Sequence, residues 1–195
     1  MSDHVHQLRE MFKILERYQM KLNPKKCFFT VAAGKFLRYM VNYRGIEANP
    51  EKIRALLEMR SPRMTKEVQS LNGRVAALSR FVARATDKCH PFFQALKGGK
   101  NFVWNEKCEA VFQELKKYLG QPPLLSKPKP EEELFLYLAV SEHAVSAVLI
   151  REENKVQWPV YYISKALLDA ETRYTEMEKL ALALVTAAKK LRPYF

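Results

Sequence analysis

Apolar residues near the start of the chain recur three and four positions apart, which is the spacing of one face of a helix. Ser2 or Asp3 can cap this segment, and we expect the helix to end near Met20. The stripe that this helix is expected to bury consists of Val5, Leu8, Phe12 and Leu15. The pattern therefore predicts an amphipathic helix.

Short β-rich runs follow around Cys27–Val31 and Phe36–Val41, with small residues between them. The pair Arg44-Gly45 closes the second run, which indicates strands and a hairpin. Asn49 and Pro50 then provide an N-cap and a proline at the first helical position. The short helix predicted there buries Ile53, Leu56 and Leu57 and stops at Ser61-Pro62.

Thr65 can cap a longer helix with a continuous apolar seam. The seam consists of Val68, Leu71, Val75, Leu78 and Val82, and three arginines lie off it, Arg74, Arg80 and Arg84. One face of this helix is therefore expected to pack while another carries positive charge. A helical piece from Pro91 to Leu96, a turn at Gly98-Gly99 and an amphipathic helix over Glu106–Leu119 complete this part.

The hydrophobic period changes to two beyond a proline- and glutamate-rich boundary at Leu125–Glu133. The β runs expected there are Leu134–Val140, Ala144–Ile150 and Val160–Ile163, and a helix is expected over Glu171–Leu191. Three strands and one helix would leave a sheet face uncovered, so this domain is incomplete or packs against a partner or against the first domain. The fold class predicted for the chain is α+β.

Positive charge is confined to the first part of the chain. Residues 1–120 hold 23 Lys and Arg against 11 Asp and Glu, whereas residues 121–195 hold 10 of each, so the net charge of +12 belongs to the first part. Such an asymmetry favours an anionic partner, which RNA, DNA, an acidic protein or an anionic membrane would all satisfy.

The sequence indicates neither a membrane or secreted protein nor a zinc-binding protein. The apolar runs are far shorter than the roughly 18 residues of a membrane span, and the polar start is unlike a signal peptide, so we expect an intracellular protein of the cytoplasm or nucleus with no membrane partner. Cys27, Cys89 and Cys108 lie far apart without the histidine pairing of a zinc site. We expect them to be buried free thiols.

Seven segments, in this order and spacing, resemble gypsy-type LTR retrotransposon polyproteins, particularly those of plants. They are KLNPKKC, GKFLRYMVNYRGIEANPEKI, TKEVQSLNGRVAALSRFV, FVWNEKCEAVFQELKKYL, LYLAVSEHAVSAVLIREE, PVYYISKAL and EKLALALVTAAKKLRPYF. The resemblance implies the end of a reverse transcriptase palm with its primer-grip hairpin at residues 1–49. It implies a helical thumb or connection at 50–124 and a truncated RNase H-like domain of three strands and a helix at 125–195.

The resemblance also implies that the hairpin and thumb hold a template–primer, an RNA–DNA hybrid or DNA duplex, through its phosphates. The residues expected to contact it are Lys35, Arg38, Gln69, Gly73, Arg74, Arg80 and Arg84. Arg38 stands where the family usually has glycine, so the hairpin is either distorted or gains a phosphate contact. For the three arginines, a merely solvated helix face remains the alternative.

The resemblance gives no catalytic residue to this chain. The metal-binding palm aspartates would precede Met1, and the first RNase H carboxylate is replaced by Ala139 in the triplet Ala139-Val140-Ser141. Leu180 stands at the second carboxylate position, while Glu178 is a remnant if the register slips by two residues. The parent enzyme would use Mg²⁺, whereas we expect no metal or cofactor here.

Three hypotheses follow. The chain is a non-catalytic template–primer binding fragment that works with the rest of a polyprotein. Alternatively, it keeps RNase H or polymerase activity as part of that larger protein, or it is an interaction module or a decaying reading frame. Sequence alone leaves all three open.

Overall fold

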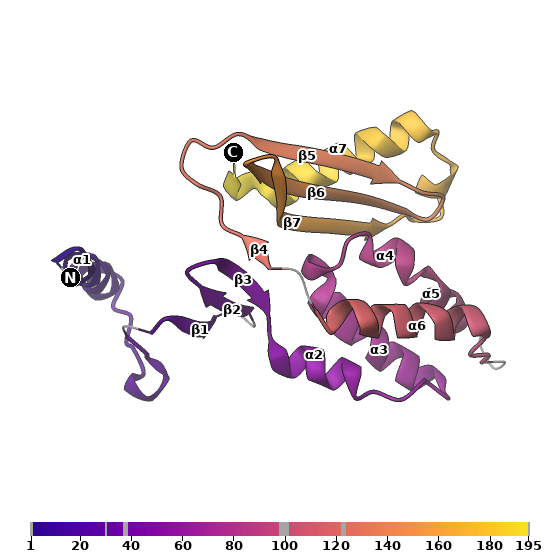
Figure 1. Cartoon of the computed structure of the whole chain (residues 1–195), viewed down its shortest axis with the longest axis horizontal. Coiled ribbons are helices and arrows are strands. Elements are labelled where there is room, and N and C mark those ends of the chain that lie inside the picture. The colour runs from indigo at the N-terminus through magenta and orange to yellow at the C-terminus, as the bar shows by residue number, and fades with distance from the viewer. Residues whose placement is uncertain (1, 30, 37–38, 98–101, 122–123, 195) are drawn as a thin grey trace. The chain divides into compact units, whose positions relative to one another are not determined.

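The structure, a computed structural model, describes residues 2–29, 31–36, 39–97, 102–121 and 124–194, without the side chains of residues 2, 3 and 97. It divides into two compact units, Met1–Gly34 and Lys35–Phe195 (Figure 1). Three expectations lie outside the described residues: the contact by Arg38, the turn at Gly98-Gly99, and the cap by the side chain of Ser2 or Asp3.

The first unit contains helix α1 (Ser2–Arg17) and the 3-10 turn η1 (Pro24–Lys26). The helix ends at Arg17 rather than near Met20, and Gln19 follows with a left-handed backbone, φ 53°. The expectation of a buried stripe is wrong within this unit, because Val5 and Phe12 are 50% and 44% exposed. A unit of this size has few apolar surfaces that could cover these side chains. Phe12 does contact Phe29, with ring centroids 6.4 Å apart.

The strand expected over Cys27–Val31 is also absent from the described residues 27–29 and 31. Asn23 caps η1, and the Cys27 amide donates to the Pro24 carbonyl oxygen at 3.3 Å. This local hydrogen bond closes a turn, so the Cys27 amide is not available for hydrogen bonding to a neighbouring β-strand.

A small sheet has the order β1 (Ala33–Phe36), β2 (Tyr39–Asn42), β3 (Gly45–Ala48), β4 (Leu125–Ser126). Strands β2 and β3 form an antiparallel hairpin with Asn42 opposite Gly45, which confirms the hairpin predicted at Arg44-Gly45. Strand β4 pairs Leu125 with Ile46. The segment that sequence marked as a boundary thus adds an edge strand to this sheet.

Helices follow the hairpin: α2 (Pro50–Leu57), α3 (Thr65–Leu78), α4 (Ala85–Lys88), α5 (His90–Lys97) and α6 (Glu106–Leu119), with the 3-10 turn η2 (Ser79–Phe81) after α3. The Asn49 side chain accepts the Glu51 amide at 2.9 Å, which confirms the predicted N-cap. The expected Thr65 cap is wrong, because Thr65 is already helical. Met64 is the N-cap residue and its side chain makes no cap hydrogen bond.

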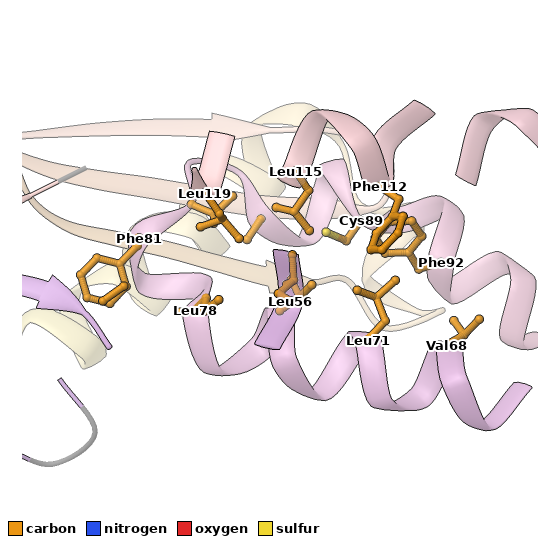
Figure 2. Packing of buried hydrophobic residues seen from close by; sticks show 14 of the residues in the cluster. Leu56, Val68, Leu71, Leu78, Phe81, Cys89, Phe92, Phe112, Leu115 and Leu119 are labelled. Carbon is orange, nitrogen blue, oxygen red and sulfur yellow. The ribbon is translucent and has the colours of Figure 1, made fainter. Parts of the chain in front are cut away.

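The seam predicted on α3 is buried and forms the centre of the main core (Figure 2). Labelled members of this cluster are Leu56, Val68, Leu71, Leu78, Phe81, Cys89, Phe92, Phe112, Leu115 and Leu119. The Trp104 ring stacks on Phe92 and meets Phe112 edge-on, at centroid distances of 5.5 and 6.0 Å. Helices α2 to α6 therefore enclose one apolar core.

The second sheet is antiparallel with the order β5 (Leu134–Val140), β6 (Ala144–Glu153), β7 (Val156–Ala166). Both β6 and β7 run further than predicted. The turn between them needs only Asn154 and Lys155, whose φ angles are 53° and 64°. A tight two-residue turn with positive φ suits the twist of a hairpin and lets both strands extend.

Helix α7 (Glu176–Leu191) lies against β5 and β6, while β7 contacts η2 and α4 (Figure 1). Residues 171–173 of the expected helix form the 3-10 turn η3 instead, because Thr175 caps α7. The chain ends in the 3-10 turn η4 (Arg192–Tyr194). The predicted α+β class is confirmed, and part of the second sheet face rests on the helical core through Tyr162.

No helix in the described part of the chain is long and apolar enough to cross a membrane. Of the cysteines, Cys89 and Cys108 are buried free thiols as expected, whereas Cys27 is only half-buried.

Candidate nucleic-acid interface

The outer face of α3 is exposed and carries small side chains. Gln69, Gly73, Ala76 and Ala77 are all exposed. A Cβ atom added at Gly73 would meet no atom within 4 Å, so nothing inside the protein requires a glycine there. Glycine in a helix interior costs about 0.5–1 kcal/mol relative to alanine, so its presence suits an external surface that must come close to the backbone.

A hollow of about 240 Å³ lies beside this face. Its lining includes Tyr39 of β2, Lys52 of α2, and Ala76 and Ala77 of α3. Lys52 is exposed. The hairpin, α2 and α3 therefore enclose a groove that carries positive charge on one wall.

Arg74 does not share this exposed face. It is half-buried, and its guanidinium donates to the Ala55 carbonyl oxygen near the end of α2. At about 100° of turn per residue, Arg74 points well away from Gly73, whereas Ala77 returns close to it. The side chain ties α3 to α2, which is an internal role that the sequence pattern does not reveal.

Arg80 lies between two aromatic rings. Its guanidinium carbon is 4.8 Å from the Tyr39 ring centroid and 4.4 Å from that of Tyr161, and its Nη2 donates to the Tyr161 hydroxyl at 2.9 Å. Tyr39 belongs to the hairpin and Tyr161 to β7. Arg80 therefore joins three elements through stacking and cation–π attraction.

Lys35 and Arg84 are both paired with carboxylates. Lys35 bonds to Glu51 at 2.5 Å, and this hydrogen bond together with the charge attraction lowers the pKa of Glu51. Arg84 pairs with Asp87 and has a left-handed backbone, φ 53°, just before α4. Both cations stay largely exposed, so these pairs are weak and leave them accessible to an anion.

The expected RNase H positions carry no carboxylate cluster. Ala139 is in β5, paired with Ser146, and Leu180 is half-buried on α7. Glu178 completes the capping box of α7: it accepts the Thr175 amide at 2.8 Å and the Thr175 hydroxyl at 2.9 Å, and these bonds lower its pKa. Among the described residues, no group of three His, Cys, Asp or Glu side chains is placed to hold a metal ion.

Several contacts of this region could not be predicted from the sequence. Asp87 accepts a hydrogen bond from Ser141, and the His90 and His143 rings stack with centroids 3.9 Å apart. Tyr161, the partner of Arg80, is 81 residues away in the chain. Each of these contacts joins the helical region to the second sheet. No local spacing signals such pairs, since tertiary packing alone brings them together.

The last part of the chain is similar to a known protein family. Residues 104–195 match the family model described as an RNase H-like domain found in reverse transcriptase. This match covers α6, both hairpins of the second sheet and α7, and it agrees with the predicted relation to a reverse transcriptase and RNase H region.

Relatives extend the likeness to the whole chain. The Tf2-3 and Tf2-4 transposon polyproteins of the fission yeast Schizosaccharomyces pombe are each 26% identical over 194 residues. These residues are 99% of this chain but 15% of either polyprotein, so the chain spans only a small share of its curated relatives. These matches support the predicted origin in a retrotransposon polyprotein.

Solved structures agree in fold. A foamy viral protease–reverse transcriptase in complex with an RNA/DNA hybrid has a TM-score of 0.75 at 22% identity, covering 98% of this chain and 26% of that chain. The same viral protein in complex with double-stranded DNA has a TM-score of 0.73 at 22% identity, covering 99% and 40%. The chain therefore has the fold of the corresponding region of a reverse transcriptase.

Proposed function

We propose that this chain is a template–primer binding segment of a retrotransposon reverse transcriptase and that it catalyses no reaction by itself. The observation that carries the proposal is the exposed face of α3, where Gly73 leaves open space beside a groove lined by Lys52. The excess of 23 cations over 11 anions in residues 1–120 supplies the attraction for a nucleic-acid backbone.

The similar viral structures contain an RNA/DNA hybrid or double-stranded DNA, and we extend these ligands to the present chain as partners. Backbone contacts of this kind position a duplex without reading its sequence. We therefore expect affinity for hybrid and duplex DNA alike, with little sequence preference and strong dependence on salt.

Fluorescence anisotropy with a labelled RNA–DNA hybrid at several salt concentrations tests the proposal. Each phosphate neutralised contributes about −0.9 to the slope of log affinity against log salt for B-DNA. Charge reversal at Lys52 and Lys66, which are exposed on α2 and α3, should weaken binding to all sequences alike. Lys155→Glu, in the β6–β7 turn and outside the lining of the groove, is the matched control. A slope near zero excludes the proposal.

The absence of catalysis is part of the proposal and has its own test. RNase H chemistry needs two metal ions gathered by several carboxylates, and Ala139 and Leu180 replace two of the expected ligands. The purified chain should leave a labelled hybrid uncut in Mg²⁺ or Mn²⁺. Cleavage that Glu178→Gln abolishes would show instead that Glu178 is a catalytic remnant and not only a helix cap.

We further propose a gypsy-type element of a plant as the source, an intracellular location, and the rest of the polyprotein as a partner. The seven segments in register support this origin. The neighbouring genomic frame tests it: an open frame that encodes a palm upstream agrees with a polyprotein, whereas a stop codon there indicates a relic.

A further inference from the structure

A second, smaller hollow lies where the helical region meets the second sheet. It measures about 150 Å³, and its lining includes Tyr39, Ser79, Arg80, Tyr161, Ser164 and Lys190. The hairpin, η2, β7 and α7 each contribute to it. Drug-sized ligands occupy pockets of roughly 300–1,000 Å³, so this hollow suits one small group rather than a nucleotide.

The charge of this hollow is positive. Arg80 and Lys190 line it, and none of its lining residues is acidic. Among the described residues no carboxylate pairs with either cation, in contrast to Lys165 of β7, which bonds to Glu171 at 2.7 Å. The two cations are therefore left without a counter-ion from the part of the chain that the structure describes.

The guanidinium of Arg80 is held in position before any ligand arrives. Its guanidinium carbon lies over the rings of Tyr39 and Tyr161, at 4.8 and 4.4 Å from their centroids, and one N–H donates to the Tyr161 hydroxyl at 2.9 Å. A guanidinium has five N–H donors in one plane, so donors remain at its edge for an anion. A planar fork of this kind matches phosphate oxygens, and its fixed orientation lowers the entropy lost on binding.

The hollow continues the surface proposed for the duplex. Ser79 and Arg80 directly follow α3, and Tyr39 also lines the larger groove beside Ala76 and Ala77. We propose that Arg80 and Lys190 together bind one backbone phosphate of a duplex that lies along α3. This inference rests on the proposed function, and the ligand is a phosphodiester.

Salt titrations with the full chain and a labelled RNA–DNA hybrid provide the test. Lys190→Ala should make the salt slope shallower by at most about 0.9 and weaken binding at 0.1 M salt by at most roughly eightfold, because Arg80 still contacts the phosphate. Lys189→Ala, its exposed neighbour on α7 that does not line the hollow, should match the wild type. Equal slopes for the two variants would overturn the phosphate site while leaving the proposed function intact. A wild type that does not bind the hybrid would overturn both.

Neutral methylphosphonate linkages placed one at a time along the hybrid locate the phosphate. One position should weaken binding in the wild type and weaken it less in Lys190→Ala, where only Arg80 remains to contact that phosphate. If Lys190→Ala instead alters binding of inorganic phosphate and no linkage position is coupled to Lys190, the site holds a free anion and the inference is wrong. Unfolding curves of both lysine variants should coincide, which separates binding from stability.

Discussion

The hydroxyl group of Ser141 donates a 2.6 Å hydrogen bond to the carboxylate of Asp87, joining the end of β5 to α4. Asp87 also pairs with Arg84. The resemblance places Ser141 last in a triplet whose first position, here Ala139, is expected to hold a metal-binding carboxylate in the family. In this chain the strand end therefore holds the sheet to the helical region.

Ser141→Ala should destabilise the protein. Hydrogen bonds to charged groups contribute about 1.5–3 kcal/mol, and Asp87 would lose one of its partners. Urea denaturation of this variant should give a free energy of unfolding lower by about 1–2 kcal/mol. Ser70→Ala, on the exposed face of α3, is the control and should change stability by less than about 0.5 kcal/mol. Equal stability of the two variants would mean that the Ser141–Asp87 bond contributes nothing.

Gly73→Ala should separate stability from binding. No atom obstructs a methyl group at this position, so the helix should gain about 0.5–1 kcal/mol. The same methyl group would project into the space proposed for the duplex and should lower hybrid affinity. Ala77→Gly, a turn further along, should lower stability without adding bulk. A stabilised Gly73→Ala variant with unchanged affinity would place the duplex elsewhere.

Gly45→Ala should damage the first sheet. The φ of Gly45 is 147°, and an added Cβ would overlap the backbone carbonyl oxygen of Leu125 in β4. Backbone strain of this kind costs about 1–3 kcal/mol, so thermal unfolding should shift down by several degrees. At Gly34 the nearest atom to an added Cβ is a Val31 methyl at 3.7 Å, an ordinary contact. Gly34→Ala is therefore the control, and an equal shift there would contradict the prediction.

Glu109 should make stability depend on pH. Its carboxylate accepts hydrogen bonds from Gln113 at 2.7 Å, Trp104 at 2.7 Å and Ser61 at 3.0 Å, and these bonds lower its pKa. Because the folded-state pKa is depressed, the contribution is present above the unfolded value of about 4.3 and is lost as pH falls through the folded-state pKa.

Trp104 fluorescence in a Trp158→Phe background would follow this transition. Acid should lower the free energy of unfolding of the Glu109-containing protein more steeply than that of Glu109→Gln between about pH 5 and pH 3. The glutamine variant keeps an acceptor oxygen but does not titrate. Parallel pH profiles for the two proteins would show that Glu109 has an ordinary pKa.

Local pattern was sufficient for most elements of the second unit. The hairpin at Arg44-Gly45, the cap at Asn49 and the buried seam of α3 all depend on residues within a few positions of one another. The predicted ends of the helices and strands were less accurate. The N-cap residue of α3 is Met64 and not Thr65, and β7 extends well beyond Val160–Ile163.

The candidate site was predicted only in part. Gln69 and Gly73 are exposed on one face as the resemblance implies, whereas Arg74 bonds to a backbone carbonyl of α2 and Arg80 makes cation–π contacts with two tyrosines. Residue type and charge alone did not show that Arg74 and Arg80 have partners inside the protein. Lys52 and Lys190 could not be predicted as site residues, because isolated surface lysines form no sequence pattern.

Residue identity and short-range spacing were sufficient to predict the class of the fold and the concentration of cations before residue 121. The placement of Ala139 and Leu180 at carboxylate positions is a prediction from the resemblance alone. Tertiary structure decided which cations have internal partners and that β4, from the expected boundary, joins the first sheet. It also brought Tyr39, Arg80, Tyr161 and Lys190 around one hollow. Those contacts join residues far apart in the chain, and only packing of the completed core fixes their distances.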